Sequence, residues 1–395
     1  MKKDYDAVIA GYLCVDLIPE FKREKPVTYI AEFLKPGKLI ELNGLDVTLG
    51  GVVANTGIAM KKFSKNIFLN SVIGDDFIGK ICSDWLNEYN VPGDIRTLKG
   101  SGTALGLVIA PPGVDRIFLE SPGCSQLFDI GYINFEAIAK SRLFHFGYPP
   151  LLKQFYLNDG RQLLEMFREV KRMGVITSMD FSLPDGESGK INWPDILQRV
   201  LPFTDIFTPS LEEALQIMMP SMYAEIQSAA DDNVEIIDLI PITTIRELGK
   251  CIIDAGVKIA LIKAGHRGAY LWTGDMLQIN ENCGFRLSKN HWNYRELWCR
   301  AYPVDQDRIR NASGAGDMAV AAFLSAILDG EVPENSLKYA TIAGRNNLYC
   351  YNIYNEVFDW QDMTEGIRSE PNEIVDLKEL KSADGVDLDI TALKE

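Results

Sequence analysis

Residues 311–330 read NASGAGDMAVAAFLSAILDG, a run of small residues, one acid and then an almost wholly apolar segment. On a helix, the apolar residues 318–328 would lie on every side, which is typical of a buried helix. Asp329 and Gly330, followed by Pro333, end the helix. The first turn of this helix should therefore lie deep in the fold, beside the glycine-rich loop.

The loop before this helix has the features of an anion-binding position. Gly314, Ala315 and Gly316 carry almost no side chain, so their backbone N–H groups can approach a ligand, and the helix N-terminus adds about half a positive charge. Asp317 stands at the helix start, which favours its ionised form. It can accept a proton from an attacking hydroxyl while the amides hold the developing negative charge. The alternative is that Asp317 only caps the helix and the glycines only make a tight turn.

A second phosphate motif is only apparent. Residues 74–81, GDDFIGKI, match the spacing GxxxxGK, but Ile81 stands where a P-loop needs Ser or Thr to hold magnesium. Asp75 and Asp76 would also repel a phosphate, at about 4 kcal/mol for each like-charge contact at 4 Å. We therefore interpret this segment as a structural turn.

The composition is that of a globular protein with an acidic surface. Of 395 residues, 47% are hydrophobic and 24% are charged, the formal net charge is −15, and no Lys/Arg-rich run is present. This charge disfavours nucleic acid and anionic membranes as partners. A site for an anionic substrate must therefore supply local positive potential.

Cysteine and histidine usage argues against disulfides and zinc. The seven cysteines are scattered without a CxxC pair, which is typical of free thiols in a reducing compartment. None of the three histidines pairs with another at helical spacing, so no zinc site is expected.

The N-terminal apolar run is short and interrupted by acids, as in a first strand rather than a signal peptide. No stretch is long enough to span a membrane, and we expect a cytoplasmic protein.

Strands and helices alternate along most of the chain. Residues 6–17, DAVIAGYLCVDL, indicate a buried strand, a glycine and a turn. From residue 142 the alternation becomes regular, with short links between strands and helices. This order predicts βαβ units, hence an α/β fold of three layers with a mostly parallel sheet and helices on both faces.

Short exposed strands interrupt this order and predict a small β-sheet lid, formed by about 20–49 and 103–120. Residues 219–241 and 280–305 look like insertions, the second rich in aromatic residues. That second segment either closes over a site or is a surface excursion packed by its own Trp and Tyr. We expect one domain over 1–358 and a polar, acidic extension over 359–395.

The motifs together resemble the ribokinase-like, PfkB-type carbohydrate kinase family, whose dispersed signature spans residues 6 to about 350 here. The matching stretches are AGYLCVDL (10–17), Gly50-Gly51 with Asn55, IGDDFIG (73–79), TPSLEEA (208–214), IKAGHRGAYL (262–271) and NASGAGD (311–317). The resemblance implies a ribokinase-like fold with a lid, ATP and Mg2+ as cofactors, and direct in-line transfer to a sugar or sugar-like polyol.

The resemblance also implies the site residues. Asp317 would be the base and the 314–316 amides the anion hole. Asp16, Gly50, Gly51 and Asn55 would bind the substrate, and Ser210, Glu213, Lys263, Gly265, Gly268 and Asn346 would bind the nucleotide, with Glu213 reaching Mg2+ through water.

Three departures from the family pattern are present. Asn311 replaces the first aspartate of the signature, so a monovalent cation is doubtful. Ser210 replaces the asparagine of the N-x-x-E motif, which bears on magnesium handling. The adenine region near 343–352 does not match residue by residue, and Asn346 is explained equally well as a packed polar residue.

Three functions stay open at this stage. The first is an ATP-dependent kinase of a sugar or polyol. The second is a kinase of a nucleoside or another small ring compound, and the third a catalytically weak ligand-binding or regulatory protein on the same scaffold. We also expect no nucleic-acid or membrane partner, and a possible homodimer through the lid.

Overall fold

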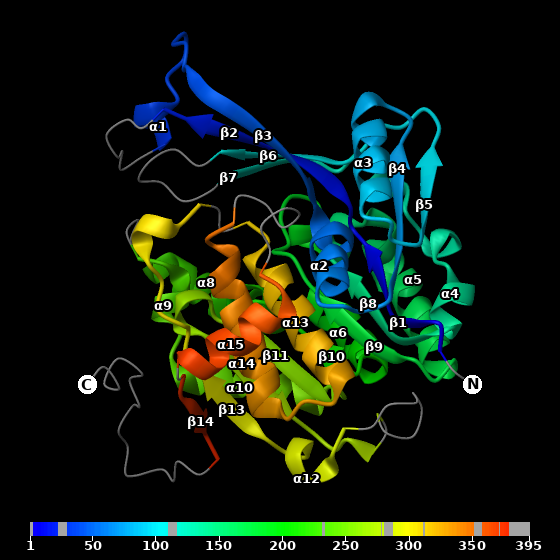
Figure 1. Ribbon diagram of the computed structural model, residues 1–395, viewed down its shortest axis with the longest axis vertical. Coiled ribbons are helices and arrows are strands. Elements are labelled where there is room, and N and C mark those ends of the chain that lie inside the picture. Colours follow the sequence, from blue (N-terminus) through cyan, green and yellow to red (C-terminus); the bar gives the residue numbers. More distant parts are fainter. Residues whose placement is uncertain are drawn as a thin grey trace.

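A ten-stranded sheet forms the centre of the molecule (Figure 1). The computed structural model describes residues 3–22, 30–109, 117–230, 234–277, 279, 287–310, 313–350, 358–370 and 372–378. The strands follow one another in space as β14 (Ile374–Asp376), β13 (Glu296–Cys299), β12 (Ala269–Thr273), β11 (Ile259–Lys263), β10 (Ile206–Phe207), β9 (Ile176–Asp180), β8 (Ser141–Gly147), β1 (Tyr5–Gly11), β4 (Ile67–Gly74) and β5 (Gly93–Leu98). Neighbours from β5 to β11 are parallel, whereas β11 to β14 pair antiparallel. The mostly parallel sheet predicted from the sequence is confirmed.

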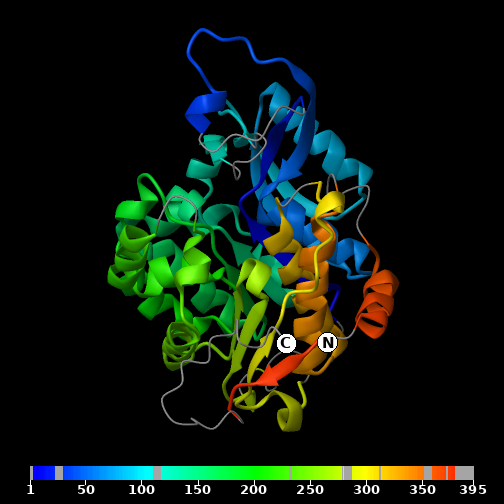
Figure 2. The ribbon, with the colours of Figure 1, turned by 90° about the vertical axis from the view of Figure 1, so that its left-hand side faces the viewer.

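Helices cover both faces of this sheet, as predicted (Figures 1 and 2). One core cluster joins the sheet to α2 (Gly51–Lys62), α3 (Phe77–Glu88), α13 (Ala315–Asp329), α14 (Pro333–Asn347) and α15 (Trp360–Ser369). The other joins it to α4 (Phe135–Ala139), α5 (Lys153–Arg172), α6 (Trp193–Val200), α7 (Leu211–Met218), α8 (Pro220–Ala229) and α10 (Ile242–Asp254). Strands covered on both faces are nearly continuously apolar, as in the buried run 7–10 of β1. The short helices are α1 (Ile30–Phe33), α9 (Ile236–Leu239) and α12 (Lys289–Trp292), and Trp292 of α12 belongs to the first core cluster.

A separate four-stranded sheet forms the lid at one end of the molecule (Figures 1 and 2). Its strands, in spatial order, are β3 (Leu42–Gly50), β2 (Cys14–Phe21), β6 (Leu105–Ile109) and β7 (Ile117–Ser121). The β6–β7 pair is antiparallel and lies in the segment predicted for the lid at about 103–120. Only residues 12 and 13 separate β1 of the main sheet from β2 of the lid, so the lid starts directly at the carboxyl end of a central strand.

Two sequence interpretations need correction. The segment after Gly11 was expected to be a turn, but residues 14–21 form a lid strand, so Asp16 lies in the lid sheet. The segment 280–305 was expected to be an insertion, but β13 within it pairs with β12 in the main sheet. Trp292, Trp298 and Tyr302 of this segment are buried in the main cores, because they pack against the sheet and its helices instead of one another.

The described cysteines Cys14, Cys82, Cys124, Cys251, Cys299 and Cys350 form no disulfide with one another, and only Cys251 among them is exposed. Cys283, the seventh cysteine, and Asn311 of the predicted signature lie outside the described residues. Over the described parts of the chain, no helix combines the length and the apolar character needed to cross a membrane.

Candidate active site

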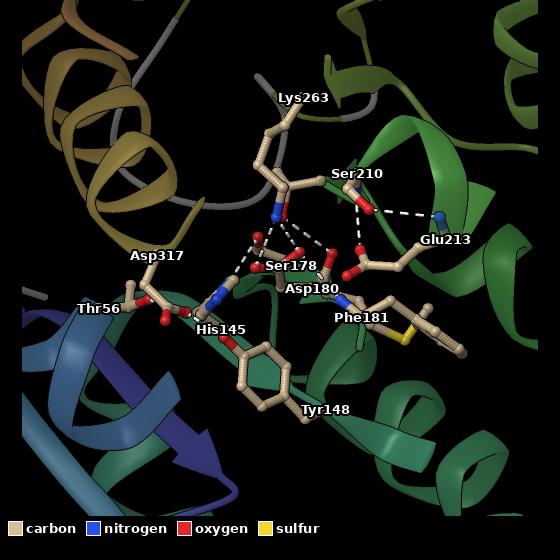
Figure 3. A network of polar contacts seen from close by, with 12 residues as sticks. Thr56, His145, Tyr148, Ser178, Asp180, Phe181, Ser210, Glu213, Lys263 and Asp317 are labelled. Carbon is tan, nitrogen blue, oxygen red and sulfur yellow. Dashed lines mark hydrogen bonds and ion pairs between the residues drawn. The ribbon is translucent and has the colours of Figure 1, made fainter. Parts of the chain in front are cut away.

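The candidate site lies where the carboxyl ends of β8, β9 and β11 meet the start of α13 (Figure 3). In parallel α/β sheets, ligands bind beyond the carboxyl ends of the strands. Tyr148 directly follows β8, Asp180 ends β9 and Lys263 ends β11. The site is therefore built from segments far apart in the sequence that one sheet edge brings together.

Asp317 is the third residue of α13, and only 4% of it is exposed. The helix begins after Gly314, whose φ of 78° is left-handed and suits glycine without strain. The first helical hydrogen bond runs from Met318 N to Gly314 O at 2.9 Å. The amides of Ala315, Gly316 and Asp317 therefore precede the intrahelical bonds, and Gly316 is exposed. This end of the helix can hold an anion beside the Asp317 carboxylate.

Three neutral donors hold the Asp317 carboxylate. Tyr148 Oη donates to Oδ1 at 2.6 Å and Thr56 Oγ1 to the same oxygen at 3.3 Å, while Asn55 Nδ2 donates to Oδ2 at 2.9 Å. Burial raises the pKa of Asp317, and these hydrogen bonds together with the charge of Lys263 oppose that rise. The expectation that the helix start alone keeps this group ionised is thus incomplete, because desolvation is the largest influence on it. Asn55, expected against the substrate, contacts the expected base, and its contact with a substrate stays a prediction.

Lys263 is the cation of the site. Its Nζ donates to Asp180 Oδ1 and Oδ2 at 2.8 and 3.0 Å, and 14% of its side chain is exposed. A methyl group placed on Gly316 would lie 3.6 Å from Nζ, so the ammonium group adjoins the start of α13. Burial alone lowers the pKa of Lys263, but Asp180, Glu213 and Asp317 outweigh burial and raise it. Lys263 is therefore charged and adds positive potential to the anion position.

Asp180 is a buried partner that the sequence interpretation missed. Burial raises its pKa to about 7, against the lowering effect of Lys263 and with Glu213 and Asp317 adding to the rise. Both of its oxygens accept from the same ammonium group, which is the arrangement of an ion pair. An acid at the carboxyl end of a buried strand, as in residues 176–180, was the available signal.

Ser210 and Glu213 form a capping box at the start of α7. Glu213 N donates to Ser210 Oγ at 3.3 Å, and Glu213 Oε2 accepts from Ser210 N at 2.7 Å. Ser210 also bridges to Lys263 as an isolated parallel pair. The two residues therefore sit beside the cation of the site, with Glu213 in a structural role that the family resemblance did not imply.

His145 lies in β8 within this network (Figure 3). Its Nδ1 is 2.9 Å from Ser178 Oγ, and Nε2 is buried with no hydrogen-bond partner from any described residue. Burial, and secondarily Lys263, lowers the pKa of His145 to about 3. The ring is therefore neutral, in agreement with a structural histidine.

Asp16 reaches the site from the lid. It is paired with Thr48 of β3 on one side and Gly106 of β6 on the other, and Gly106 is paired with Glu120 of β7. Residues directly opposite on neighbouring strands share one face of the sheet. A methyl group on Gly106 would lie 2.3 Å from Asp16 Oδ1 and 3.5 Å from Glu120 Oε2, so both carboxylates lie over this glycine. The two acids form one acidic row on the lid.

The predicted glycines have packing roles in this geometry, and their contacts with substrate or nucleotide stay predictions. A methyl group on Gly50 would lie 2.3 Å from Asp16 Oδ2, and one on Gly51 2.5 Å from Tyr12 O, so both glycines allow close packing. A methyl group on Gly268 would lie 2.0 Å from Cys299 O, so this glycine also allows close packing. Gly265 begins the short 3-10 turn that precedes Gly268.

Asn346 and Asn347 of α14 form their hydrogen bonds with Arg345 and Ser313, outside the cluster around Asp317 and Lys263. Asn346 is buried, accepts from its neighbour Arg345 and lines a small apolar cavity with Met318 and Phe63. Asn347 Nδ2 donates to Ser313 O at 2.9 Å and so anchors the glycine-rich loop. The role of Asn346 at a nucleotide remains a prediction.

Sequence comparison relates this chain to a known protein family. The pfkB family carbohydrate kinase profile matches residues 24–354. The chain is 24% identical over 297 residues to probable fructokinase-2 of Arabidopsis thaliana, covering 74% of this chain and 76% of that protein. It is 26% identical over 137 residues to the chloroplastic probable fructokinase-6 of the same plant, covering 34% of this chain and 35% of that protein.

Solved structures share the fold. Arabidopsis thaliana ribokinase complexed with ribose and ATP superposes with a TM-score of 0.64 at 18% identity, over 91% of this chain and 98% of that one. An E. coli structure solved with ATP and Mg2+ gives a TM-score of 0.65 at 17% identity, over 93% of this chain and 100% of that one. With the family profile matched over most of its length, the chain belongs to the pfkB family of carbohydrate kinases.

Proposed function

We propose that this protein transfers the terminal phosphoryl group of ATP to a hydroxyl of a neutral sugar or polyol, with Asp317 as general base. The observation that supports this best is the position of Asp317. Its buried carboxylate lies at the start of α13, next to amides that precede the helical hydrogen bonds and near the Lys263 ammonium. An acceptor hydroxyl and a phosphate can meet at such a place.

The protein's part in the reaction is positioning and charge stabilisation. Asp317 takes the proton of the acceptor hydroxyl. At the same time, the oxygen of that hydroxyl bonds to the terminal phosphorus of ATP, and the bond between this phosphorus and the departing ADP breaks. The amides of Ala315 and Gly316 and the Lys263 ammonium lie where negative charge on the transferred group can be stabilised. They supply the local positive potential that a chain of net charge −15 needs.

The residues present fit a nucleotide that brings its own metal ion. Within the described residues, no group of three or more His, Cys, Asp or Glu side chains could hold a metal. We therefore infer that Mg2+ binds through phosphate oxygens and water, with Glu213 as an indirect partner beside Lys263. When bound, the ion supplies charge neutralisation of the phosphates. Potassium dependence stays doubtful, because Asn311 replaces an acid.

The acidic row of the lid favours an uncharged substrate. Asp16 and Glu120 lie over Gly106, and Asp16 also interacts electrostatically with Asp317. Burial raises the pKa of Asp16 to about 6, whereas Glu120 lies exposed on the lid, and both carboxyl groups can exchange hydrogen bonds with sugar hydroxyls. A sugar acid or sugar phosphate would bring a further negative charge next to these two carboxyl groups and should bind poorly.

A substrate panel with purified protein and Mg-ATP tests the proposal by following ADP release. D-fructose and D-ribose lead the panel because relatives are named fructokinase and ribokinase. Sugar acids, sugar phosphates and nucleosides complete it. Turnover of at least one neutral sugar is expected, whereas turnover confined to nucleosides would favour the second function.

The third function, a weak binding protein, predicts a different outcome. This third function is supported if no compound is phosphorylated and Mg-ATP does not raise the stability of the fold. A ligand at about 100 times its dissociation constant should add about 2.7 kcal/mol to the free energy of unfolding. The cytoplasmic location and a homodimer through the lid remain predictions. The second is supported by apolar, partly exposed side chains, among them Leu45 and Leu119, on the lid face opposite Asp16.

A further inference from the structure

Tyr148 has a backbone conformation that is uncommon for its type. It follows β8 with φ 65° and ψ 51°, in the left-handed region where glycine is favoured. Such conformations are retained at functional sites when the surrounding structure needs the side chain. The tyrosine ring lies 6.4 Å from the ring of Tyr12, at the passage from β1 to the lid.

The Tyr148 hydroxyl is directed at the Asp317 carboxylate (Figure 3). The 2.6 Å bond to Oδ1 is in the short range typical of a hydroxyl that donates to a carboxylate. A carboxylate has about four acceptor positions, two on each oxygen. Tyr148 and Thr56 fill both positions on Oδ1, and Asn55 fills one on Oδ2. Within the part of the chain that the structure describes, the remaining acceptor position is on Oδ2.

We propose that Tyr148 is a positioning residue for the catalytic base, which directs Oδ2 at the acceptor hydroxyl and keeps the carboxylate ionised. The inference rests on the function proposed above. In the reaction, the acceptor O–H proton moves to Oδ2 while the Tyr148 proton stays on its own oxygen. Burial, followed by the charge of Asp317, raises the pKa of Tyr148, so the phenol remains a donor.

A neutral donor suits the charges around Asp317. The ionisable groups that face it are Lys263 from β11, Asp180 from β9, Glu213 from α7, Asp16 and Cys14 from β2, and Tyr148 after β8. Most of these groups are acids that oppose its ionisation, and Lys263 already pairs with Asp180. Tyr148 favours the carboxylate without adding a second fixed cation that would hold the base away from its substrate.

The test is the pH dependence of kcat/KM in three matched variants. Tyr148→Phe removes the short bond to Oδ1, and Thr56→Val removes the 3.3 Å bond to the same atom. Tyr12→Phe is the control, because the Tyr12 hydroxyl is buried and finds no hydrogen-bond partner among the described residues. We expect Tyr148→Phe to move the acidic limb to higher pH, with roughly tenfold lower kcat/KM on that limb. Thr56→Val should shift it less in the same direction, and Tyr12→Phe should leave it in place.

Two results would overturn the inference. One is an acidic limb in Tyr148→Phe that superposes on the wild-type limb. The other is a lower KM for the sugar with an unmoved limb, which would mean that the phenol merely occupies the place of the acceptor hydroxyl.

A second readout is independent of turnover. The 13C shift of the Asp317 carboxyl, titrated by NMR in wild type and Tyr148→Phe, should show a higher pKa in the variant. If the substrate panel finds no sugar kinase activity, the proposed function fails, while this titration still decides whether Tyr148 controls the ionisation of Asp317. Equal titration curves in the two proteins would refute that control.

Discussion

Replacement of Lys263 by methionine should show how much the ion pair between Lys263 and Asp180 contributes to the stability of the fold. The change keeps an unbranched side chain but leaves Asp180 buried without the ammonium that contacts both of its oxygens. Removing one partner of a buried ion pair costs about 3–5 kcal/mol of stability. We therefore expect Lys263→Met to lower the free energy of unfolding by about that amount at pH 8.5.

The stability lost in Lys263→Met should increase as the pH rises. Burial already raises the pKa of Asp180 to about 7 with Lys263 in place. Without Lys263 that pKa rises further, so the folded variant holds a proton that the unfolded chain releases. Its stability should then fall by about 1.4 kcal/mol for each pH unit until Asp180 ionises. At pH 6 the carboxyl is neutral in the folded variant, and the loss should be much smaller.

Urea unfolding of a double-mutant cycle at pH 6 and pH 8.5 measures both effects. In Lys263→Met/Asp180→Asn the unpaired charge is gone, so most of the stability lost at pH 8.5 should return, whereas activity should not. Lys250→Met is the control, since its i,i+4 partner Asp254 is exposed and such pairs contribute about 0.3–0.5 kcal/mol. An equal unfolding midpoint for Lys263→Met and wild type at both pH values would refute the reasoning, as would a double variant no more stable than the single one.

Two further predictions concern the lid and the turn after β11. Asp16→Asn and Glu120→Gln should reduce the discrimination against sugar acids and sugar phosphates by about tenfold or more, because each removes a carboxylate from the acidic row. The ratios of kcat/KM for neutral and anionic sugars measure this discrimination, and unchanged ratios would contradict the prediction. Gly268→Ala should destabilise the fold by about 3 kcal/mol or more, because its φ is 110° and the added methyl group would meet Cys299 O at 2.0 Å. Gly100→Ala, left-handed at φ 73° but with open space around it, should lose only about 1 kcal/mol; equal unfolding midpoints for the two variants would show that the close contact is unimportant.

Local sequence patterns were sufficient to predict the glycine-rich loop, the buried helix α13 and the mostly parallel sheet. In each case the signal lies within about 20 residues: small residues before an apolar run, or alternation of strand and helix. The lid was also predicted, but its first strand was mistaken for a turn. A chain that leaves one sheet and enters another without a break shows no change of composition at Gly11.

The partners of Asp317 could not be predicted in the same way. Asn55 and Thr56 are 262 and 261 residues away in the sequence, and Tyr148 is 169 residues away. Only the parallel sheet and α2 bring them together. The same holds for Asp180 and Lys263, which are 83 residues apart on strands separated by β10. Their pairing follows from strand order, which the sequence pattern does not specify.

Phosphoryl transfer by Asp317→Asn tests the proposed general base most directly. The amide keeps the shape of the side chain but cannot accept the acceptor proton. Burial raises the pKa of Asp317, so the ionised carboxylate opposes folding near neutral pH, and the neutral amide should leave stability unchanged or higher. Asp329→Asn, at the exposed far end of α13, is the matched control.

In a single-turnover assay with saturating Mg-ATP and the best sugar of the panel, Asp317→Asn should transfer phosphate about 100-fold to 10,000-fold more slowly than wild type. Nucleotide affinity should remain within a few-fold of wild type, and Asp329→Asn should react at the normal rate. A folded Asp317→Asn protein that transfers phosphate within about twofold of the wild-type rate would contradict the account.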